Sequence, residues 1–493
     1  MSKRERNQKN GILVKLLITI ISSFFVIAVF AGIVLVVSKY IMKDDMAVAK
    51  DYSDEYGKSV AEQEVPVQDY SEALLKEFNK KSTVSESNIS MEELADENET
   101  SEAEPEKKTR EITMVFTGDV CFYDGYANMA AYRNRGSSIE KCISQELLEE
   151  MRSADICMIN NEFAYSKQGA PLAGKEYTLC SKPENVNILH DMGVDIVSLA
   201  NNHVYDYGKE AFLDTLSTLK NADVPYVGAG ENLEEASKPY IFEIAGRKIA
   251  YLSATQVERN ANPETRGATV DTPGVFRCFT DEEFHNLTDA IKRVDQDVDM
   301  TVVYVHWGSE NTDKLHWAQE QQAPEMVKAG ADLIIGDHPH CLQNLDYIDG
   351  VPVIYSLGNY WFNSKDRDTG LFKAVLNTDG ILECQFIAAK QHDCRTDYQT
   401  GEEKQRILDY MQCISPNVTI DDDGYISNKP YDGPAIDYSR VQRVPPPPVT
   451  KIQIADPTTG EVRTIDKNTG QVLDPGTGAG TGIYVDPATG MLR

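Results

Sequence analysis

The sequence predicts an α/β domain whose sheet faces are covered by helices, preceded by an N-terminal transmembrane helix. Three observations lead to this prediction. Short β-branched runs alternate with amphipathic stretches over much of the chain, polar residues follow several of these runs, and one long apolar run lies near the N-terminus.

The apolar run covers residues 16–38, 23 residues without a charge. At roughly 1.5 Å per residue it can cross a hydrocarbon layer of ~30 Å. A cleaved signal peptide would have a shorter apolar region ending in small residues, and Ser38, Lys39 and Tyr40 offer no such site. The basic residues within 1–15 outnumber those that follow the run. We therefore expect a cytoplasmic segment 1–15, a single-pass anchor in the cell membrane, and an extracellular main domain.

Residues 39–110 predict an acidic, disordered stalk. They show little sustained apolar periodicity, and residues 86–106 contain nine acidic residues and no basic one. Such a composition repels itself and cannot bury a core.

Residues 111–440 form the predicted domain. The strand candidates cover residues 111–120, 154–162, 194–203, 299–308, 331–340 and 351–362. The helix candidates between them cover residues 144–153, 184–192, 209–221, 281–294 and 318–329. Because polar residues gather where the strands end, the site is expected at the C-terminal ends of the strands.

Residues 441–493 predict a proline-rich linker and a repeat tail. Pro445 to Pro448 favours a stiff, extended segment. Beyond it Asp-x-x-Thr-Gly occurs four times, beginning at Asp456, Asp466, Asp474 and Asp486. These turn-forming units predict short hairpins or a disordered tail.

Charge and cysteine content exclude two kinds of site. The net charge of −30 argues against nucleic-acid binding, because affinity for a phosphate backbone depends on Lys and Arg. The nine cysteines show neither a CxxC motif nor a framework spacing. We interpret them as small core residues rather than disulfides or zinc ligands.

Histidines concentrate at the predicted strand ends, where four of the eight lie: His203, His306, His338 and His340. In an extended segment His338 and His340 would point to the same side. Asp119, Glu162 and Asn202 also end strands and supply oxygen ligands. This mixed set predicts one or two divalent metal ions such as manganese, iron or zinc.

Metal ions at this edge would activate a water molecule for hydrolysis. His203 is the candidate general acid for the leaving group. The alternative is that His203 only orients the neighbouring ligand Asn202.

Six motifs occur in order along residues 111–390: FTGDV, ADICMINNE, SLANNHVYDYG, VHWGSE, GDHPHCLQ and YSLGNYWF. Together they resemble the CapA family, the capsule-synthesis and poly-gamma-glutamate-synthesis proteins of the metallophosphatase (calcineurin-like phosphoesterase) superfamily. The resemblance implies a four-layer α/β/β/α sandwich, in which two sheets lie between layers of helices.

The resemblance also implies roles for residues within these motifs. Asp119 resembles the aspartate of the first metal motif, Glu162 an acidic residue that bridges the ions, and Asn202 the asparagine ligand. The remaining ligands would be His306, His338 and His340, with His203 placed to protonate a leaving group.

Two departures from the superfamily pattern affect the metal site. Cys121 stands where a histidine is usual, and Glu162 where aspartate is usual. Either change would reduce the site to one tightly held ion or alter its metal preference.

Four further residues of the motifs are candidates for the site, three for its pocket and one for catalysis. Trp307, Glu310 and Asn359 are assigned to substrate binding, although Trp307 could equally belong to the core, and Glu310 could instead orient a ligand. Asp206 either supports His203 in catalysis or lies near the start of the following helix as part of its cap.

The family resemblance implies a membrane-anchored protein for synthesis, export or surface attachment of an anionic capsule polymer such as poly-gamma-glutamate. We expect a metal-dependent hydrolase acting on a phosphoester or amide of the polymer or its carrier, working beside other capsule-synthesis membrane proteins. The alternatives are a non-catalytic, metal-binding component that assembles or binds the polymer, and a general surface phosphoesterase.

Overall fold

The computed structural model describes residues 110–257 and 266–443, apart from residue 381, and four tail strands within 451–484. The predicted anchor at residues 16–38 lies outside these ranges, as does the predicted stalk before residue 110. None of the helices in the described ranges combines the length and apolar character needed to span a bilayer.

The first sheet is mixed and follows the order β19-β20-β17-β16-β1-β2-β5-β6, with β15 beside β1 and β18 beside β17. Its strands are β1 (Ile112–Val120), β2 (Ile156–Asn161), β5 (Ile196–Ser198), β6 (Tyr226–Val227), β15 (Asn359–Trp361), β16 (Arg367–Leu376), β17 (Leu382–His392), β18 (Arg395–Tyr398), β19 (Thr419–Ile420) and β20 (Tyr425–Ser427). Strands β1, β2, β5 and β6 are parallel, so their C-terminal ends lie at one edge of the sheet.

The second sheet has the order β13-β14-β12-β11-β9-β8. Its strands are β8 (Tyr240–Ile244), β9 (Arg247–Thr255), β11 (Met300–His306), β12 (Leu333–Asp337), β13 (Leu345–Ile348) and β14 (Val351–Ile354). The four from β9 to β14 are parallel, with antiparallel strands at both edges.

The two sheets pack face to face through one apolar layer. Phe116 of β1 contacts Tyr251 of β9 with ring centroids 6.4 Å apart, and Met300, Val302 and Tyr304 of β11 belong to the same buried cluster. The residues that alternate with these along the same strands face the helices, because successive side chains of a strand point to opposite faces of the sheet.

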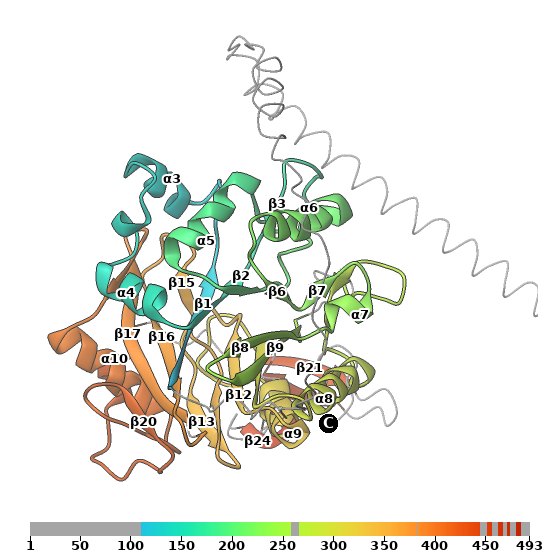
Figure 1. The fold of residues 1–493 in the computed structure, drawn as a ribbon. Helices are drawn as coiled ribbons and strands as arrows, with labels where there is room; N and C mark the ends of the chain where they lie inside the picture. The colour runs from blue at the N-terminus through green and yellow to red at the C-terminus, as the bar shows by residue number, and fades with distance from the viewer. Residues whose placement is uncertain are drawn as a thin grey trace, which may run out of the picture. The chain divides into compact units, whose positions relative to one another are not determined.

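Helices cover the outer face of each sheet (Figure 1). The first sheet is covered by α3 (Ala127–Asn134), α4 (Gln145–Ser153), α5 (Asn187–Met192) and α6 (Gly208–Asn221), and the second by α7 (Leu233–Ala236), α8 (Asp281–Asp295) and α9 (Trp317–Ala329). The remaining helices, α10 (Gly401–Ile414) and α11 (Tyr438–Val441), pack against the apolar layer between the sheets. The prediction of an α/β fold is confirmed, and the two sheets with helices outside them give the four layers that the resemblance implies.

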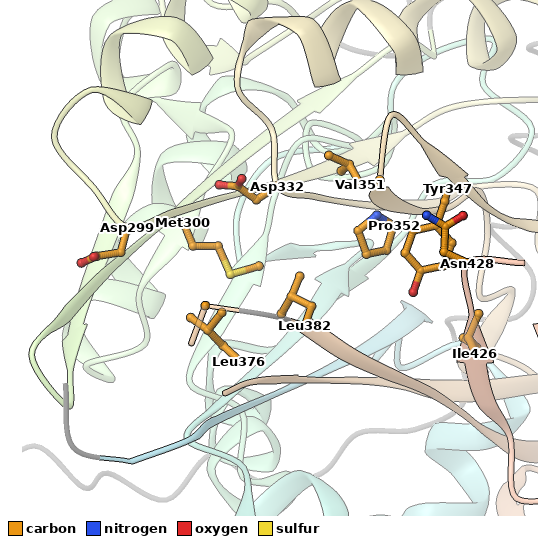
Figure 2. Close-up of a pocket in the computed structure, with 12 residues that line it drawn as sticks. Asp299, Met300, Asp332, Tyr347, Val351, Pro352, Leu376, Leu382, Ile426 and Asn428 are labelled. Carbon is orange, nitrogen blue, oxygen red and sulfur yellow. The ribbon is translucent and has the colours of Figure 1, made fainter. Parts of the chain in front are cut away.

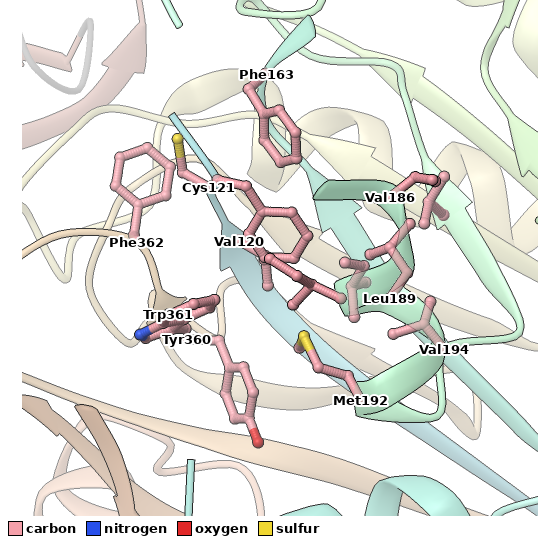
Figure 3. Packing of buried hydrophobic residues seen from close by; sticks show 14 of the residues in the cluster. Val120, Cys121, Phe163, Val186, Leu189, Met192, Val194, Tyr360, Trp361 and Phe362 are labelled. Atoms are coloured by element: carbon pink, nitrogen blue, oxygen red, sulfur yellow. The ribbon is translucent and has the colours of Figure 1, made fainter. Parts of the chain in front are cut away.

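Figure 3 shows the packing of α5 against the first sheet, where Leu189 and Met192 lie near Val120 of β1. All five predicted helices are present. The predicted helix at 184–192 begins with a short 3-10 turn (Pro183–Val186) before α5, and Pro183 occupies the first position, where proline is favoured. At α8, Thr280 and Glu283 form a capping box that fixes the start of the helix.

Smaller elements complete the described chain. The strand pairs are β3 (Ala164–Tyr165) with β4 (Cys180–Ser181), and β7 (Ala229–Gly230) with β10 (Gly274–Val275). The tail strands β21 (Lys451–Ala455), β22 (Val462–Asp466), β23 (Gln471–Leu473) and β24 (Gly480–Tyr484) form an antiparallel sheet, which bears out the hairpin alternative.

All nine cysteines carry free thiols, and only Cys180 and Cys413 are not fully buried. The interpretation as small core residues holds for the seven buried cysteines.

A cavity of about 460 Å³ lies at the N-terminal ends of β11 and β14. Figure 2 shows Met300, Leu376 and Leu382 lining it. Of its two carboxylates, Asp332 accepts a hydrogen bond from the backbone N–H of Thr301 at 2.8 Å, and Asp299 accepts one from that of Lys248 at 2.9 Å. Neither carboxylate belongs to the candidate metal groups found among the described residues.

Candidate metal centre

The predicted ligands meet where the C-terminal ends of the two sheets come together. The first sheet contributes Asp119 in β1, Glu162 directly after β2, and Asn202 and His203 in the loop after β5. The second sheet contributes His306 at the end of β11, and His338 and His340 just after β12. The site therefore depends on both sheets.

Glycines allow the segments that carry the ligands to approach closely. A Cβ on Gly118 would lie 1.9 Å from the carbonyl oxygen of Gly358, and the N–H of Asp119 donates to that oxygen at 2.9 Å. Gly358 itself has φ of 66°, a conformation that favours glycine. The glycines of TGDV and SLGN therefore bring Asp119 and Asn359 together.

Three overlapping groups of side chains could hold a metal ion: Glu162, His306 and His338; Asp119, Glu162 and His340; and Asp119, His306 and Asp337. Within each group the ligand atoms lie within 4.8 Å of one another. Asp119, Glu162 and His306 each belong to two groups, so they would be shared if two ions were bound.

His306 contacts the second sheet through one ring nitrogen and the first sheet through the other. Its Nδ1 lies 2.8 Å from Oδ1 of Asp337, and its Nε2 lies 2.9 Å from Oδ1 of Asn202. Burial lowers the pKa of His306 to about 3, so the ring is neutral and suited to bind a metal ion.

Asp119 interacts mainly with His340. The His340 Nδ1 lies 2.9 Å from the Asp119 carboxylate and 2.8 Å from Oδ1 of Asn359. Burial works to raise the pKa of Asp119, but the hydrogen bond and charge of His340, with help from His306 and Asn160, lower that pKa to about 2. Asp119 is therefore ionised in the folded protein.

Glu162 and Asp337 are buried carboxylates with unsatisfied oxygens. Both side chains are fully buried. Within the described ranges, neither oxygen of Glu162 accepts a hydrogen bond, and nor does Oδ2 of Asp337. Burial, reinforced by the charge of Asp119, raises the pKa values of the Glu162 and Asp337 carboxyl groups well above their ordinary values. A divalent cation would satisfy these oxygens and balance the charge, so the residues present fit a metal ion.

The two histidines after β12 lie in a turn, whereas the sequence predicted an extended segment. His338 has φ of 91° and His340 has φ of 56°, both in the left-handed region that non-glycine residues rarely adopt. The turn still places the rings side by side, with centroids 5.9 Å apart. Strained backbone of this kind is typical of functional sites.

His203 belongs to a buried chain of polar groups with Asp206 and Lys175. Its Nδ1 lies 2.6 Å from Oδ2 of Asp206, and the Lys175 ammonium donates to Oδ1 of Asp206 at 2.6 Å. The side chains of Lys175 and Asp206 are 3% and 0% exposed. Burial lowers the pKa of His203, although Asp206 opposes this effect. With Nδ1 held by Asp206, Nε2 lies 3.8 Å from Glu162.

A cavity of about 220 Å³ opens beside the cluster, lined in part by His203, His340, Glu310 and Asn359. The assignment of Glu310 and Asn359 to a pocket therefore agrees with their location. Trp307 does not line this cavity. Its indole is fully buried, stacks on Tyr355 at 5.6 Å, and belongs to the core under the helices of the second sheet. The period of two explains this, since His306 faces the site and the next residue faces away.

Cys121 lies in the core and not at the metal centre. It is fully buried among apolar residues that include Phe163 and Trp361, and it belongs to none of the candidate metal groups found among the described residues. Burial raises the pKa of its thiol well above the ordinary value, which disfavours the thiolate that binds metals.

Sequence reasoning missed three residues of the site: Asp337, Asn160 and Lys175. Asp337 ends β12 directly before His338 within the quoted motif GDHPH, so its position was a usable signal. Asn160 donates to Asp119 at 3.0 Å and precedes Glu162 by two residues in β2. Lys175 lies in a loop that carries no periodic pattern, and nothing in the sequence distinguishes it.

A sequence profile of the bacterial capsule synthesis protein family PGA_cap matches residues 113–364, about half of the chain. The chain belongs to this family. The PGA_cap match contains every predicted ligand, and it confirms the resemblance to CapA proteins and their metallophosphatase-like superfamily.

Three curated relatives agree with the PGA_cap assignment. The capsule biosynthesis protein CapA of Bacillus anthracis is 35% identical over 43% of this chain and 52% of its own length. The PGA biosynthesis protein CapA of Bacillus subtilis is 34% identical over 45% of this chain and 57% of its own length. A probable polyglutamine synthesis accessory protein of Mycobacterium tuberculosis is 26% identical over 43% and 56%, respectively. The chain thus spans about half the length of these relatives.

Among solved structures, the crystal structure of a Thermus thermophilus protein gives a TM-score of 0.30 at 10% identity, covering 56% of this chain and 98% of that one. A likeness of this size carries no conclusion about function.

Proposed function

We propose that this PGA_cap protein works in synthesis, export or surface attachment of an anionic capsule polymer such as poly-gamma-glutamate, as a metal-dependent hydrolase. The unsatisfied oxygens of Glu162 and Asp337, buried beside three histidines, are the observation that carries the metal-dependent part. The family match and the names of the Bacillus relatives support the capsule part.

The proposal includes a place in the cell and partners. The apolar run at residues 16–38 supports a single-pass anchor with the main domain outside the cell membrane. The expected partners are the membrane, the polymer or its carrier, and other capsule-synthesis membrane proteins.

One or two divalent ions, manganese, iron or zinc, would lower the pKa of a bound water molecule and polarise a phosphoester or amide. The candidate ligands are Asp119, Glu162, Asn202, His306, His338 and His340, with Asp337 added from the structure. Lys175 and Asp206 hold His203 with Nε2 toward the cluster, where a proton that Nε2 takes up from solvent can pass to a leaving group.

A second candidate is a non-catalytic component that uses bound metal to hold the polymer's carboxylates. The position of Cys121 favours it, because its buried thiol leaves the centre without the histidine usual in metallophosphatases. Turnover by the purified chain separates this candidate from the hydrolase, and the range of substrates separates both from a general surface phosphoesterase.

The test is metal content by mass spectrometry on the purified full chain, beside a variant with His338→Gly and His340→Gly. Glycine removes the imidazoles and suits the positive φ of both positions, so loss of metal would not reflect backbone strain. Asp349→Gly is the matched control, since Asp349 also has a positive φ of 49° and is exposed in another turn.

We expect one or two equivalents of metal in the wild type and the control, and none in the double variant. A wild-type chain that stays free of metal after incubation with manganese, iron and zinc would overturn the proposal. If metal is present, phosphoester and gamma-glutamyl amide substrates should then be screened for turnover.

A further inference from the structure

The cavity beside the metal centre carries two cationic side chains that the proposed chemistry does not use. Arg367 begins β16, and Lys365 lies in the loop before it. Both line the cavity together with His203 and His340. Neither forms an ion pair with a carboxylate of the described residues, although the chain has a net charge of −30 and acidic groups are abundant.

Arg367 is held in place by one hydrogen bond and leaves donors unused. Its guanidinium donates to Oδ1 of Asn311 at 2.8 Å, while its buried Nε has no partner among the described residues. Asn311 has φ of 57°, and its N–H donates to the carbonyl of Pro339 at 2.7 Å, between the two histidines. The Arg367 side chain is therefore fixed relative to the metal centre.

The loop that carries Lys365 is also held. The side chain of Gln391 is fully buried and accepts from the N–H of Phe362 at 2.7 Å, and it donates to the carbonyl of Lys365 at 2.7 Å. Phe362 packs on the ring of His340 at 5.0 Å. The backbone of this loop is thus ordered before any ligand binds, which reduces the ordering cost of binding.

The remaining charge in the cavity is Glu310, which is exposed at its rim. One carboxylate therefore faces two cations, and the aromatic rings of Tyr126 and Tyr177 complete the wall. A guanidinium suits a carboxylate or a phosphate, which accepts charge-assisted hydrogen bonds from its N–H groups.

We propose that Arg367, assisted by Lys365, forms a subsite for an anionic group of the substrate beside the bond presented to the metal centre. The inference rests on the proposed function and narrows its substrate class to molecules with a second anionic group. The shared chemistry is a carboxylate or phosphate, supplied by the polymer itself or by its carrier.

The experiment measures binding of three probes to the metal-loaded full chain by calorimetry. The probes are a gamma-glutamyl tetrapeptide, the same peptide with its carboxylates converted to amides, and inorganic pyrophosphate. The variants are Arg367→Gln, Arg367→Lys and Lys365→Gln. Arg293→Gln is the matched control, because Arg293 is exposed on α8, outside this cavity.

Loss of a charge-assisted hydrogen bond predicts that Arg367→Gln weakens binding of the anionic probe about tenfold. Arg367→Lys should weaken binding less. Arg293→Gln should bind the anionic probe as tightly as the wild type, and the amidated peptide should bind the wild type and the Arg367 variants equally. A tetrapeptide-specific loss assigns the subsite to the polymer, and a pyrophosphate-specific loss assigns it to the carrier.

Equal affinities of wild type and Arg367→Gln for both anions would overturn the subsite, as would a wild type that holds metal but binds neither. Metal content measured on the same samples distinguishes these outcomes from failure of the proposed function, in which the wild type holds no metal. Melting temperatures exclude loss of folding as the cause.

Discussion

His203 Nδ1 lies 2.6 Å from Oδ2 of Asp206, and both side chains are buried at the edge of the metal centre. Oδ1 of Asp206 accepts a hydrogen bond from the Lys175 ammonium. Oδ2 of Asp206 also accepts one from the backbone N–H of Leu179, at 2.6 Å. This arrangement fixes the orientation of the imidazole before a substrate arrives.

If His203 protonates the leaving group, His203→Gln should lower kcat by about 10²-fold to 10⁴-fold while metal content stays at the wild-type level. The measurement is steady-state kinetics on the best substrate from the screen, with metal analysis of the same samples. Unchanged kcat would assign His203 a purely orienting role.

Lys175→Met should destabilise the fold by about 3–5 kcal/mol, because it leaves the Asp206 carboxylate buried without its cation. The double variant Lys175→Met with Asp206→Asn should recover much of that loss, since no unpaired charge remains. Urea denaturation of the single and double variants measures both quantities. If the double variant loses as much unfolding free energy as Lys175→Met and Asp206→Asn lose together, the buried ion pair is contradicted.

Glu162→Gln should raise the melting temperature of the metal-free protein, because burial of the Glu162 carboxylate without a hydrogen bond is unfavourable. The same change should abolish the stabilisation by added metal, which for the wild type at a hundred times Kd is about 2.7 kcal/mol. Thermal unfolding with and without manganese or zinc tests both parts. Glu383→Gln, at an exposed position of β17 outside the cavity, is the control.

Cys121→Ser should leave metal stoichiometry unchanged and lower stability by about 1–3 kcal/mol, because it buries a hydroxyl in an apolar cluster. Metal analysis and urea denaturation measure the two effects. Loss of metal in this variant would show that the thiol contributes to the centre.

The ion pair of Arg110 and Asp155 gives a pH dependence of stability. The hydrogen bond from Arg110, with help from the N–H of Thr113, lowers the pKa of Asp155. A carboxyl whose pKa is lowered on folding stabilises the protein above its unfolded pKa of about 3.9, and this stabilisation is lost as the pH falls through the folded value. Asp155→Asn should therefore be less stable than wild type at pH 7, and this difference should shrink below pH ~4. Asp422→Asn, at an exposed position, should show no such dependence.

The fold was predictable because its elements follow simple periodicities. The helix expected at 281–294 is α8, and the strand run at 299–308 contains β11. The site was predictable to the extent that its residues end strands, as Asp119 and His306 do. Trp307 could also have been placed in the core from the sequence. Neighbouring residues of a strand point to opposite faces, so a site at His306 implies that Trp307 faces away from it.

Other parts of the site follow from tertiary structure alone. Lys175 reaches Asp206 from a loop without a periodic pattern, and the turn at His338 and His340 requires left-handed backbone that the sequence His-Pro-His does not favour. Asn311 and Arg367 are 56 positions apart, and their contact depends on the packing of the two sheets.

The sharing of the centre between two sheets also bears on how the protein matures. Asp119 and His340 are separated by 221 positions, so a nascent chain has no complete set of ligands until both sheets have been synthesised and have docked. For the proposed metal-dependent function, acquisition of the ion would then follow folding, in the compartment where the domain folds. A pulse-chase experiment that follows metal and protease resistance together would find them appearing in that order.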